Sequence, residues 1–261
     1  ALPARSTRRP CEKDAGRGSQ YHVWWMDFLY SGAAAAISEA PGDLSRPMRI
    51  RYQTVEFGKL DIHVCSLRDT QQIRDDGGRA EAAGVPEAHW SLFGVLWASG
   101  RVLANFMMDF DLQGKRVLEL GCGTGLTSLL LNKQQQDITA TDHHPDVEAW
   151  LERNAALNGD SSIPFQQASW KDGESALGLF DLIIGSDVLY EDDNVLPLVK
   201  FIEAHVRPAC EVVIVDPCRG QVGRFNREMA AYGFNCEEHL VTGNAQIGES
   251  YRGRILHHQR A

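Results

Sequence analysis

Short apolar runs alternate with helical patterns along the chain from Lys115 onward. Runs of apolar and β-branched residues predict strands at 116–120, 137–141, 163–168, 181–185, 211–216, 234–241 and 251–258. Apolar residues at helical spacing predict helices between the first five strands and another helix at 222–232. Alternating strands and helices are typical of β-α units, so we expect a mainly parallel sheet covered by helices.

The last two predicted strands are separated only by residues 242–250, a connection that contains Gly243 and Asn244. A parallel crossover needs about a dozen residues or more, whereas an antiparallel pair does not. We therefore expect an antiparallel pair at one edge of the sheet. The predicted fold is α/β: a Rossmann-like, seven-stranded, mostly parallel sheet with a reversed final strand.

Two further strands are predicted ahead of this sheet, at 49–57 and 60–67, where polar and apolar residues alternate. Gly58 and Lys59 between them suit a two-residue turn, which predicts an N-terminal β-hairpin. Residues 68–87 are polar and indicate a loop or a weak helix. Residues 92–110 are apolar at helical spacing and predict a helix.

The beginning of the chain differs in character from the rest. Residues 1–20 are polar and rich in Arg and Gly, which is typical of disorder, and 21–39 is compatible with a short helix. We expect an N-terminal extension at 1–45, partly disordered, followed by one domain at 46–261. A chain of 261 residues, 43% of them hydrophobic, can bury one substantial core.

Composition narrows the classes of function. The formal net charge of −9 disfavours a broad nucleic-acid surface, because an acidic protein repels phosphates. The most apolar early stretch, 21–37, is short for a membrane span and contains Asp27, so we expect no membrane partner. The six cysteines form no Cys-x-x-Cys pair and no zinc-like spacing with histidines. We expect reduced thiols, a cytoplasmic location and no metal.

The main chemical signal is the glycine-rich segment 117–125, Val-Leu-Glu-Leu-Gly-Cys-Gly-Thr-Gly, between a predicted strand and a predicted helix. Glycines allow a tight turn against which a ligand can lie on bare backbone, and amides at the helix start supply donors. The spacing is G-x-G-x-G rather than the G-x-G-x-x-G of dinucleotide-binding folds. Glu119 stands just before the first glycine and would attract a cation and repel a pyrophosphate. S-adenosylmethionine, with its sulfonium and ammonium groups, therefore fits better than NAD.

A second landmark is Asp142, at the end of the next predicted strand and 21 positions after Gly121. Nucleotide-binding β-α-β units place a ribose-binding acid about 20 residues after the glycine turn. The following strand ends at Ser169 and Trp170, where this class of fold reads adenine and where an aromatic ring can flank it. The alternative is an ordinary turn, a helix cap at Asp142 and a Trp170 that only packs.

The fourth strand of the sheet ends at Ser186, and Asp187 and Tyr190 follow it. Residues three apart face the same side of a helical turn, so a carboxylate and a phenol would both project toward a ligand. Methyl transfer requires the donor and a neutral nucleophile to be held close and aligned, and Asp187 can orient an amine. The alternative is that Asp187 caps the next helix and Tyr190 packs.

These motifs occur in an order that resembles a known family. Leu96-Trp97-Ala98-Ser99-Gly100 precedes the glycine turn, and Asp142, Asn154, 181–190 and Val215-Asp216-Pro217 follow it. The chain from about Arg49 onward resembles the seven-β-strand protein-lysine methyltransferases, methyltransferase family 16, and within it the group of the electron-transfer-flavoprotein β-subunit lysine methyltransferase. The resemblance implies a class I methyltransferase fold and S-adenosylmethionine as cofactor.

The resemblance also implies roles for individual residues. Glu119, Gly121 and Gly123 would contact the methionine part, Asp142 would hold the ribose, and Trp97 would help to wall the site. Asp187 and Tyr190 match an Asp-x-x-Tyr motif associated with the target lysine, and 216–219 resembles a substrate-side loop. The full prediction assigns catalysis to Asp187 and Tyr190, and cofactor binding to Trp97, Glu119, Gly121, Cys122, Gly123, Gly125, Asp142, His143, Ser169, Trp170 and Ser186.

The function predicted from the sequence is S-adenosylmethionine-dependent methylation of a lysine side chain in a protein substrate. One alternative is a small-molecule N-methyltransferase of the nicotinamide type, which shares the fold. Another is a non-catalytic adenosyl-ligand-binding module, although the intact acidic and glycine positions disfavour it. An NAD-dependent oxidoreductase fits the class of fold but not the glycine spacing. The pattern does not predict an oligomeric state.

Overall fold

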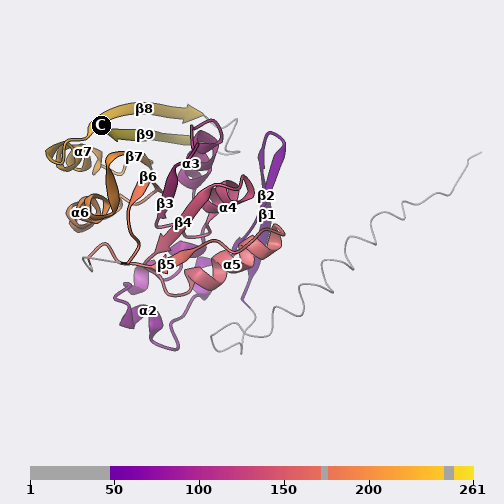
Figure 1. The fold of residues 1–261 in the computed structure, drawn as a ribbon. Coiled ribbons are helices and arrows are strands. Elements are labelled where there is room, and N and C mark those ends of the chain that lie inside the picture. Colours follow the sequence, from indigo (N-terminus) through magenta and orange to yellow (C-terminus); the bar gives the residue numbers. More distant parts are fainter. Residues whose placement is uncertain (1–47, 172–175, 244–249) are drawn as a thin grey trace, which may run out of the picture. The chain divides into compact units, whose positions relative to one another are not determined.

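The computed structural model describes residues 48–171, 176–243 and 250–261, and within these ranges seven strands form one sheet (Figure 1). Their order across the sheet is β5-β4-β3-β6-β7-β9-β8. The strands are β3 Arg116–Leu120, β4 Asp137–Asp142, β5 Phe165–Gln167, β6 Phe180–Ser186, β7 Val206–Asp216, β8 Asn235–Gly243 and β9 Tyr251–Arg260. The predicted extension at 1–45, with its compatible helix at 21–39, lies outside the described residues, so that domain boundary stays a prediction.

Strand direction confirms the predicted architecture. Strands β3 to β7 pair in parallel, whereas β9 pairs antiparallel with both β7 and β8. The last strand of the chain is thus the reversed one, inserted between β7 and the edge strand β8. A separate antiparallel pair, β1 Ile50–Phe57 and β2 Leu60–Leu67, forms the predicted hairpin across the Gly58-Lys59 turn.

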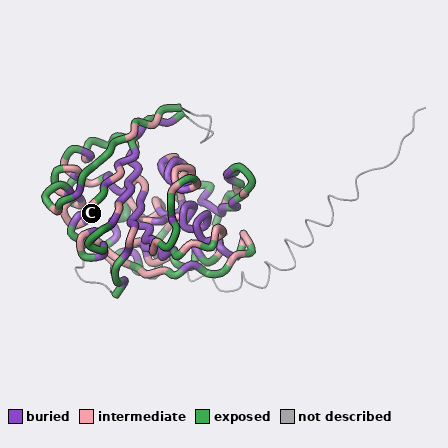
Figure 2. The backbone as a smooth tube through the Cα atoms, turned by 45° about the horizontal axis from the view of Figure 1, so that its top comes forward, coloured by how far each residue is buried: buried purple, intermediate pink, exposed green. Residues whose placement is uncertain are grey.

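Helices cover both faces of the sheet, because side chains alternate in direction along each central strand. In β7, Val213 and Val215 pack on one face, with the hairpin and with α3 Ala98–Met108, α4 Leu126–Lys133 and α5 Val147–Leu157. Val212 and Ile214 pack on the other face, with α6 Val195–His205 and α7 Val222–Ala231. The tube in Figure 2 is accordingly mostly buried along the central strands.

Several predicted elements differ from the structure, among them the strand expected at 211–216, which begins at Val206. The apolar stretch 92–110 is not one helix: a 3-10 turn, Leu92–Gly94, precedes α3, and Val95 between them is extended. The third strand is confined to Phe165–Gln167 instead of 163–168. The described residues between β5 and β6, 168–171 and 176–179, form turns and loop where a helix was expected, and Gly178 among them adopts a positive φ of 80°. The polar stretch 68–87 contains a short α2 at Arg79–Ala82 and a 3-10 turn at Thr70–Gln72.

Candidate active site

A cleft of about 480 Å³ lies across the carboxyl ends of the parallel strands. The chain passes from β3 to β4 and β5 on one side and then crosses to β6 and β7 on the other, so the order reverses beside β3. Ligands of open α/β sheets bind at such a reversal point, and the volume lies in the range of small-ligand sites. Every residue that the sequence assigns to the site lines this cleft except Gly125.

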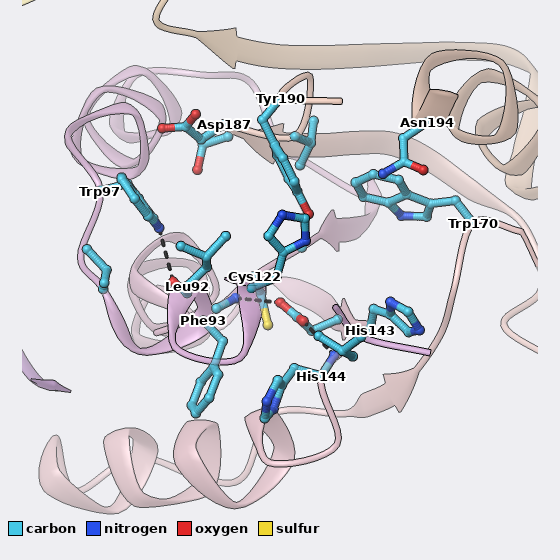
Figure 3. Close-up of a pocket in the computed structure, with 18 of the residues that line it drawn as sticks. Leu92, Phe93, Trp97, Cys122, His143, His144, Trp170, Asp187, Tyr190 and Asn194 are labelled. Atoms are coloured by element: carbon cyan, nitrogen blue, oxygen red, sulfur yellow. Dashed lines mark hydrogen bonds between the residues drawn. The ribbon is translucent and has the colours of Figure 1, made fainter. Parts of the chain in front are cut away.

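The strand order gives the cleft two ends, and Figure 3 shows Trp97 and Asp187 on one side of the close-up, His143 and Trp170 on the other and Tyr190 between them. The β4–β5 end comprises Asp142, His143, Ser169 and Trp170. The β6–β7 end comprises Trp97, Ser186, Asp187, Tyr190 and Arg219. The glycine turn after β3 lies between them. Residues more than a hundred positions apart are thus collected in one cleft by the topology of the sheet.

The glycine turn exposes bare backbone to the cleft. Gly121 and Gly123 have positive φ angles of 58° and 52°, which side chains rarely tolerate. A Cβ at Gly121 would lie 3.2 Å from Val188 Cγ1, and one at Gly123 would lie 3.0 Å from the carbonyl oxygen of Phe93. From behind, the buried Asn154 donates to the Thr124 carbonyl oxygen at 2.9 Å, which holds the turn in place.

The packing of two helices explains why residue 125 is a glycine. Its φ of 77° is also left-handed, and a Cβ there would lie 2.3 Å from Leu151 Cδ1 of α5. The glycine therefore allows α4 to begin close to α5, and it does not line the cleft. Its predicted contact with the cofactor has no support in the geometry.

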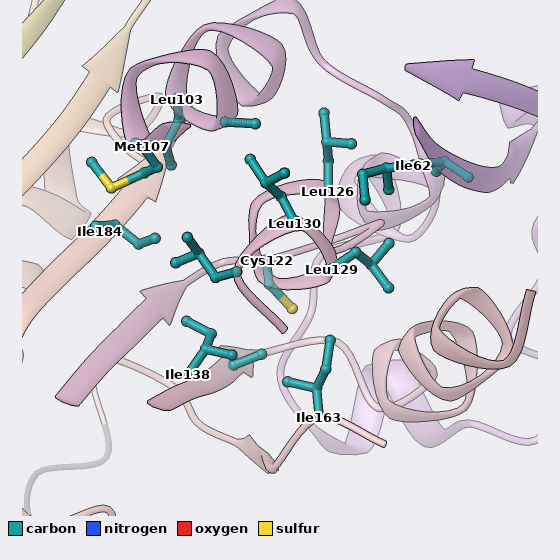
Figure 4. Close-up of a cluster of buried hydrophobic side chains, with 14 of the residues drawn as sticks. Ile62, Leu103, Met107, Cys122, Leu126, Leu129, Leu130, Ile138, Ile163 and Ile184 are labelled. Atoms are coloured by element: carbon teal, nitrogen blue, oxygen red, sulfur yellow. The ribbon is translucent and has the colours of Figure 1, made fainter. Parts of the chain in front are cut away.

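Cys122 contributes its backbone to the turn and its side chain to the core. The thiol is buried with Leu126 and Leu129 of α4 (Figure 4), and burial raises its pKa well above the ordinary range. The backbone N–H donates to the carbonyl oxygen of Thr141 at 3.0 Å, which joins the ends of β3 and β4. A buried neutral thiol is a poor nucleophile, so this cysteine has a structural role.

Glu119 places a carboxyl group at the floor of the cleft, where it is only 3% exposed. Its Oε2 accepts hydrogen bonds from the N–H of Ser128, at 2.9 Å, and from the Ser128 hydroxyl, in the first turn of α4. Burial nevertheless raises the pKa of Glu119 to about 7, because these hydrogen bonds only partly offset the loss of water. A cation entering the cleft would stabilise the charged form.

Asp142 extends from the end of β4 beside the glycine turn. Its Oδ2 accepts from the N–H of Gly123 at 3.0 Å, and its Oδ1 accepts from the N–H of His144 at 2.9 Å. Burial raises the pKa of this carboxyl as well. Each carboxylate oxygen can accept more than one hydrogen bond, so Asp142 keeps acceptor capacity for hydroxyl groups of a ligand.

Three further residues complete the β4–β5 end. The Nε2 of His143 lies 2.6 Å from the carbonyl oxygen of Ala83, which fixes the imidazole against a neighbouring loop. The hydroxyl of Ser169 accepts from the N–H of Lys171 at 3.2 Å. Trp170 forms part of the cleft wall near Gly121, as the predicted adenine-flanking position requires. The assignment of these residues to adenine stays a prediction.

At the β6–β7 end, Asp187 is held in a strained backbone conformation. Its φ is 59°, uncommon for any residue other than glycine, and its N–H donates to the carbonyl oxygen of Val215 at 2.9 Å. The side chain is paired with Arg219, whose Nε lies 2.6 Å from Asp187 Oδ1. Strained backbone at a carboxylate in a cleft is typical of functional sites, where the surrounding structure enforces a needed orientation.

Tyr190 lies at the rim of the cleft and is 41% exposed. Its ring packs edge-on against His89, with 5.4 Å between the ring centroids. Partial burial and the nearby carboxylates raise the pKa of the phenol to about 12. The hydroxyl is therefore protonated at neutral pH and able to donate a hydrogen bond.

Of one wall of the cleft, only Trp97 was predicted from the sequence. Residues 83–97 line it, with Leu92 and Phe93 from the 3-10 turn and Trp97 at the start of α3 (Figure 3). The indole N–H of Trp97 donates to the carbonyl oxygen of Leu92 at 3.1 Å, which fixes the ring. Gly84, Pro86 and Gly94 interrupt the pattern here, and these breaks are the signal that could have identified a loop.

The segment that contains these cleft residues also matches a known protein family. A family model described as lysine methyltransferase matches residues 87–223, which include the glycine turn, Asp142, Asp187 and Tyr190. The chain belongs to the lysine methyltransferase family. The resemblance seen in the sequence is thereby confirmed.

Individual relatives match part of the chain. The protein N-lysine methyltransferase METTL21A of Danio rerio is 30% identical over 148 residues, which cover 53% of this chain and 67% of the relative. The electron transfer flavoprotein beta subunit lysine methyltransferase of Xenopus laevis is 27% identical, over 52% of this chain and 54% of the relative. A histidine protein methyltransferase 1 homolog of Dictyostelium discoideum is 30% identical, over 42% of this chain and 38% of the relative. The chain thus spans between about a third and two thirds of these relatives.

Solved structures confirm the fold of this lysine methyltransferase family member. A methyltransferase from Pyrococcus furiosus superposes with a TM-score of 0.51 at 16% identity, over 70% of this chain and 98% of that chain. The [4+2]-cyclase SpnF superposes with a TM-score of 0.50 at 15% identity, over 61% and 80%. A cyclase on the same fold shows that architecture alone does not determine the reaction.

The family implies S-adenosylmethionine as cofactor, and the residues present fit it. Gly121 and Gly123 line the cleft with bare backbone against which the methionine part can lie, and the buried carboxyl of Glu119 suits a cationic group. Asp142 has acceptor capacity for ribose hydroxyls beside the same turn. Within the described ranges, no group of three or more His, Cys, Asp or Glu side chains could hold a metal ion. No helix in the same ranges is both long and apolar enough to cross a membrane.

Proposed function

We propose that this protein methylates the side-chain amine of a lysine in a protein, with S-adenosylmethionine as methyl donor. One observation supports this proposal most directly: the glycine turn, Asp142 and the Asp187–Tyr190 pair all line the same cleft. A cofactor held by the turn and Asp142 would extend toward the β6–β7 end, where a carboxylate and a phenol are available to an acceptor.

The acceptor chemistry is derived from these two side chains. When bound, the cofactor supplies an electrophilic methyl group. A lysine amine has an ordinary pKa of about 10.4 and must lose a proton before its lone pair can attack. The carboxylate of Asp187 accepts a hydrogen bond from the amine and so aims the lone pair away from itself. The protonated phenol of Tyr190, at the rim, contacts the incoming side chain and narrows its path.

Two features support a polypeptide acceptor. The relatives named above from Danio rerio and Xenopus laevis are lysine methyltransferases that act on proteins, and the lysine methyltransferase family model matches residues 87–223, which include the glycine turn. The β6–β7 end also opens outward, since Trp97, Tyr190 and Arg219 are each partly exposed at the cleft. A long, thin side chain from a second protein could reach Asp187 past these groups.

The test is a transfer experiment with an isotopic methyl group. The purified protein is incubated with S-adenosyl-[methyl-³H]methionine and proteins from a cell lysate, and the labelled protein is hydrolysed and chromatographed. Asp187→Asn serves as the inactive control. We expect tritium in methylated lysine with the wild-type chain and none with the variant. Label in methylhistidine, or in an acid-soluble metabolite, would contradict a lysine acceptor. Cofactor binding without any transfer would favour a non-catalytic module.

We further propose that the protein works in the cytoplasm. Its five described cysteines, Cys65, Cys122, Cys210, Cys218 and Cys236, are all free thiols, as is usual in a reducing compartment. Fractionation of cells with an antibody to the protein tests this. Recovery in an oxidising compartment would contradict it.

A further inference from the structure

Asp187, the carboxylate assigned above to the acceptor amine, already has a cationic partner within the chain. The Nε of Arg219 donates to Asp187 Oδ1 at 2.6 Å, and both residues line the cleft. The Asp187 side chain is only 10% exposed, whereas that of Arg219 is 40% exposed. A substrate lysine that enters the β6–β7 end therefore meets an ion pair and not a lone carboxylate.

The position of Arg219 is set by the loop that carries it. The N–H of Arg219 donates to Oδ1 of Asp216 at 3.0 Å, and Asp216 is fully buried at the end of β7. The guanidinium carbon also lies 5.9 Å from the centroid of the Trp97 ring, at the edge of cation–π range. Contacts on both sides hold the charge beside Asp187.

The second carboxylate oxygen of Asp187 is held much less firmly. Among the described residues, its one hydrogen bond comes from the Ser99 hydroxyl at 3.4 Å, near the limit for such a bond. Ser99 also shares a hydrogen bond with the hydroxyl of Tyr251 at 3.1 Å. The carboxylate thus offers Oδ1 to the guanidinium and leaves Oδ2 available to an acceptor amine.

We propose, with the lysine methylation above as premise, that Arg219 is a positioning residue that neutralises Asp187 so that the bound lysine gives up its proton. A lone carboxylate beside the amine would hold it as an ammonium ion, which has no lone pair for attack. A guanidinium on the opposite oxygen cancels most of that attraction. The ammonium proton passes to solvent at the open rim. The nitrogen lone pair then forms the N–C bond while the S–C bonding pair stays on sulfur.

None of the other described titratable groups near Asp187 supplies the positive charge of the guanidinium. Tyr190, from the segment after β6, and Tyr251, from β9, are neutral at ordinary pH, since a free phenol already holds its proton there and burial raises the pKa of each further, to about 12. Asp216 of β7 and Glu191 next to Tyr190 are acids, and Cys218 is a thiol, so none of them supplies a positive charge. Within the described residues, Arg219 is the one cation paired with Asp187.

The size of the effect follows from Coulomb's law. A unit charge about 6 Å from the amine, at an effective dielectric constant of about 20, shifts the pKa of the amine by roughly two units. Partial exposure of Arg219 screens this interaction, so we expect about one unit in practice.

The test compares three variants of the full chain. Arg219→Gln keeps hydrogen-bonding capacity but removes the charge, Arg219→Lys keeps the charge, and Arg224→Gln removes an exposed arginine of α7 that contacts Asp192 instead. The probe is the tritium label that lysate proteins acquire, measured as an initial rate between pH 6 and pH 10. Calorimetric binding of S-adenosylhomocysteine is recorded for every variant.

We expect the acid limb of the rate profile to move up by about one pH unit in Arg219→Gln, with rates that approach wild type at high pH. Arg219→Lys and Arg224→Gln should keep the wild-type limb, and all variants should bind S-adenosylhomocysteine equally. An unmoved limb in Arg219→Gln, or a loss by the same factor at every pH, would overturn the role of Arg219. Absence of label with the wild-type chain would instead remove the lysine methylation on which the role depends.

Discussion

The buried carboxyl of Glu119 should make the affinity for the cofactor depend on pH. Burial raises its pKa to about 7 in the ligand-free protein, so the group is about half ionised at neutral pH. S-adenosylhomocysteine carries the same ammonium group as the cofactor and is not consumed. If Glu119 receives a cationic group of the ligand, binding stabilises the carboxylate, lowers its pKa and releases a proton. Affinity should then rise with pH through 7 and level off above it.

The expected magnitude follows from the ionised fraction. With a pKa of about 7, roughly a tenth of the Glu119 side chains are charged at pH 6 and roughly nine tenths at pH 8. The dissociation constant for S-adenosylhomocysteine should therefore be about tenfold larger at pH 6 than at pH 8, or about 1.4 kcal/mol. Glu119→Gln should bind more weakly at pH 8 and show no such pH dependence.

Isothermal titration calorimetry measures both quantities. Titrations at pH 6, 7 and 8, each in two buffers with different ionisation enthalpies, give the dissociation constant and the number of protons released. Ser128→Ala is the matched variant, since it removes a hydroxyl that donates to Glu119 but keeps the carboxyl. Loss of that donor should move the transition to higher pH. Equal affinity at pH 6 and pH 8, with no proton release, would refute the role and leave Glu119 as a cap of α4.

Three further substitutions test the roles assigned to residues of the cleft. Asp142→Asn should weaken S-adenosylhomocysteine binding roughly 10- to 100-fold, because a charged acceptor beside Gly123 is lost; unchanged calorimetric affinity would contradict the ribose assignment. Gly121→Ala and Gly58→Ala, at φ angles of 58° and 63°, should both lower the free energy of unfolding, by about 1 kcal/mol at Gly58 and by more at Gly121, where the new Cβ would lie 3.2 Å from Val188 Cγ1. Only Gly121→Ala should reduce ligand affinity, because Gly121 lines the cleft and Gly58 does not. Equal affinities would show that the turn does not contact the ligand. Asp187→Asn, which tolerates the left-handed backbone, should abolish methyl transfer and bind S-adenosylhomocysteine within about twofold of wild type; wild-type rates would remove Asp187 from the mechanism.

Glu119 also affects the stability of the ligand-free protein. Its folded pKa of about 7 lies above the ordinary value of 4.5, so the folded state holds the proton more tightly than the unfolded state. The free energy of unfolding should fall as pH rises from about 4.5 to 7, by at most about 3 kcal/mol. Urea titrations across this range check the slope, which Glu119→Gln should reduce. An identical slope in the variant would show that another group is responsible.

Much of the fold could be predicted because each strand has a clear period and the connections limit the topology. The short stretch at 242–250 sufficed to predict the reversed strand β9. The helix predicted at 92–110 was wrong in its first part, because apolar content at helical spacing outweighed the break at Gly94. Burial explains the difference: Phe93 and Gly94 pack against the glycine turn and the hairpin in a 3-10 turn that the extended Val95 separates from α3.

The site could be predicted in outline because its residues follow strand ends, and parallel strands bring those ends together. Pairings across the sheet could not be predicted. Arg219 lies 32 positions from Asp187, and their contact depends on the loop after β7 and on side-chain conformation. The role of Gly125 could not be predicted either. A glycine is needed there because Leu151 approaches closely, and no local sequence pattern reveals that contact.

The most direct test of the central claim is a crystal structure of the chain with S-adenosylhomocysteine bound. We expect the ribose hydroxyls on Asp142, the amino-acid part against Gly121 and Gly123, and the sulfur facing the end of the cleft where Asp187 and Tyr190 lie. A ligand bound elsewhere, or with its sulfur directed away from Asp187, would contradict the proposed route of methyl transfer.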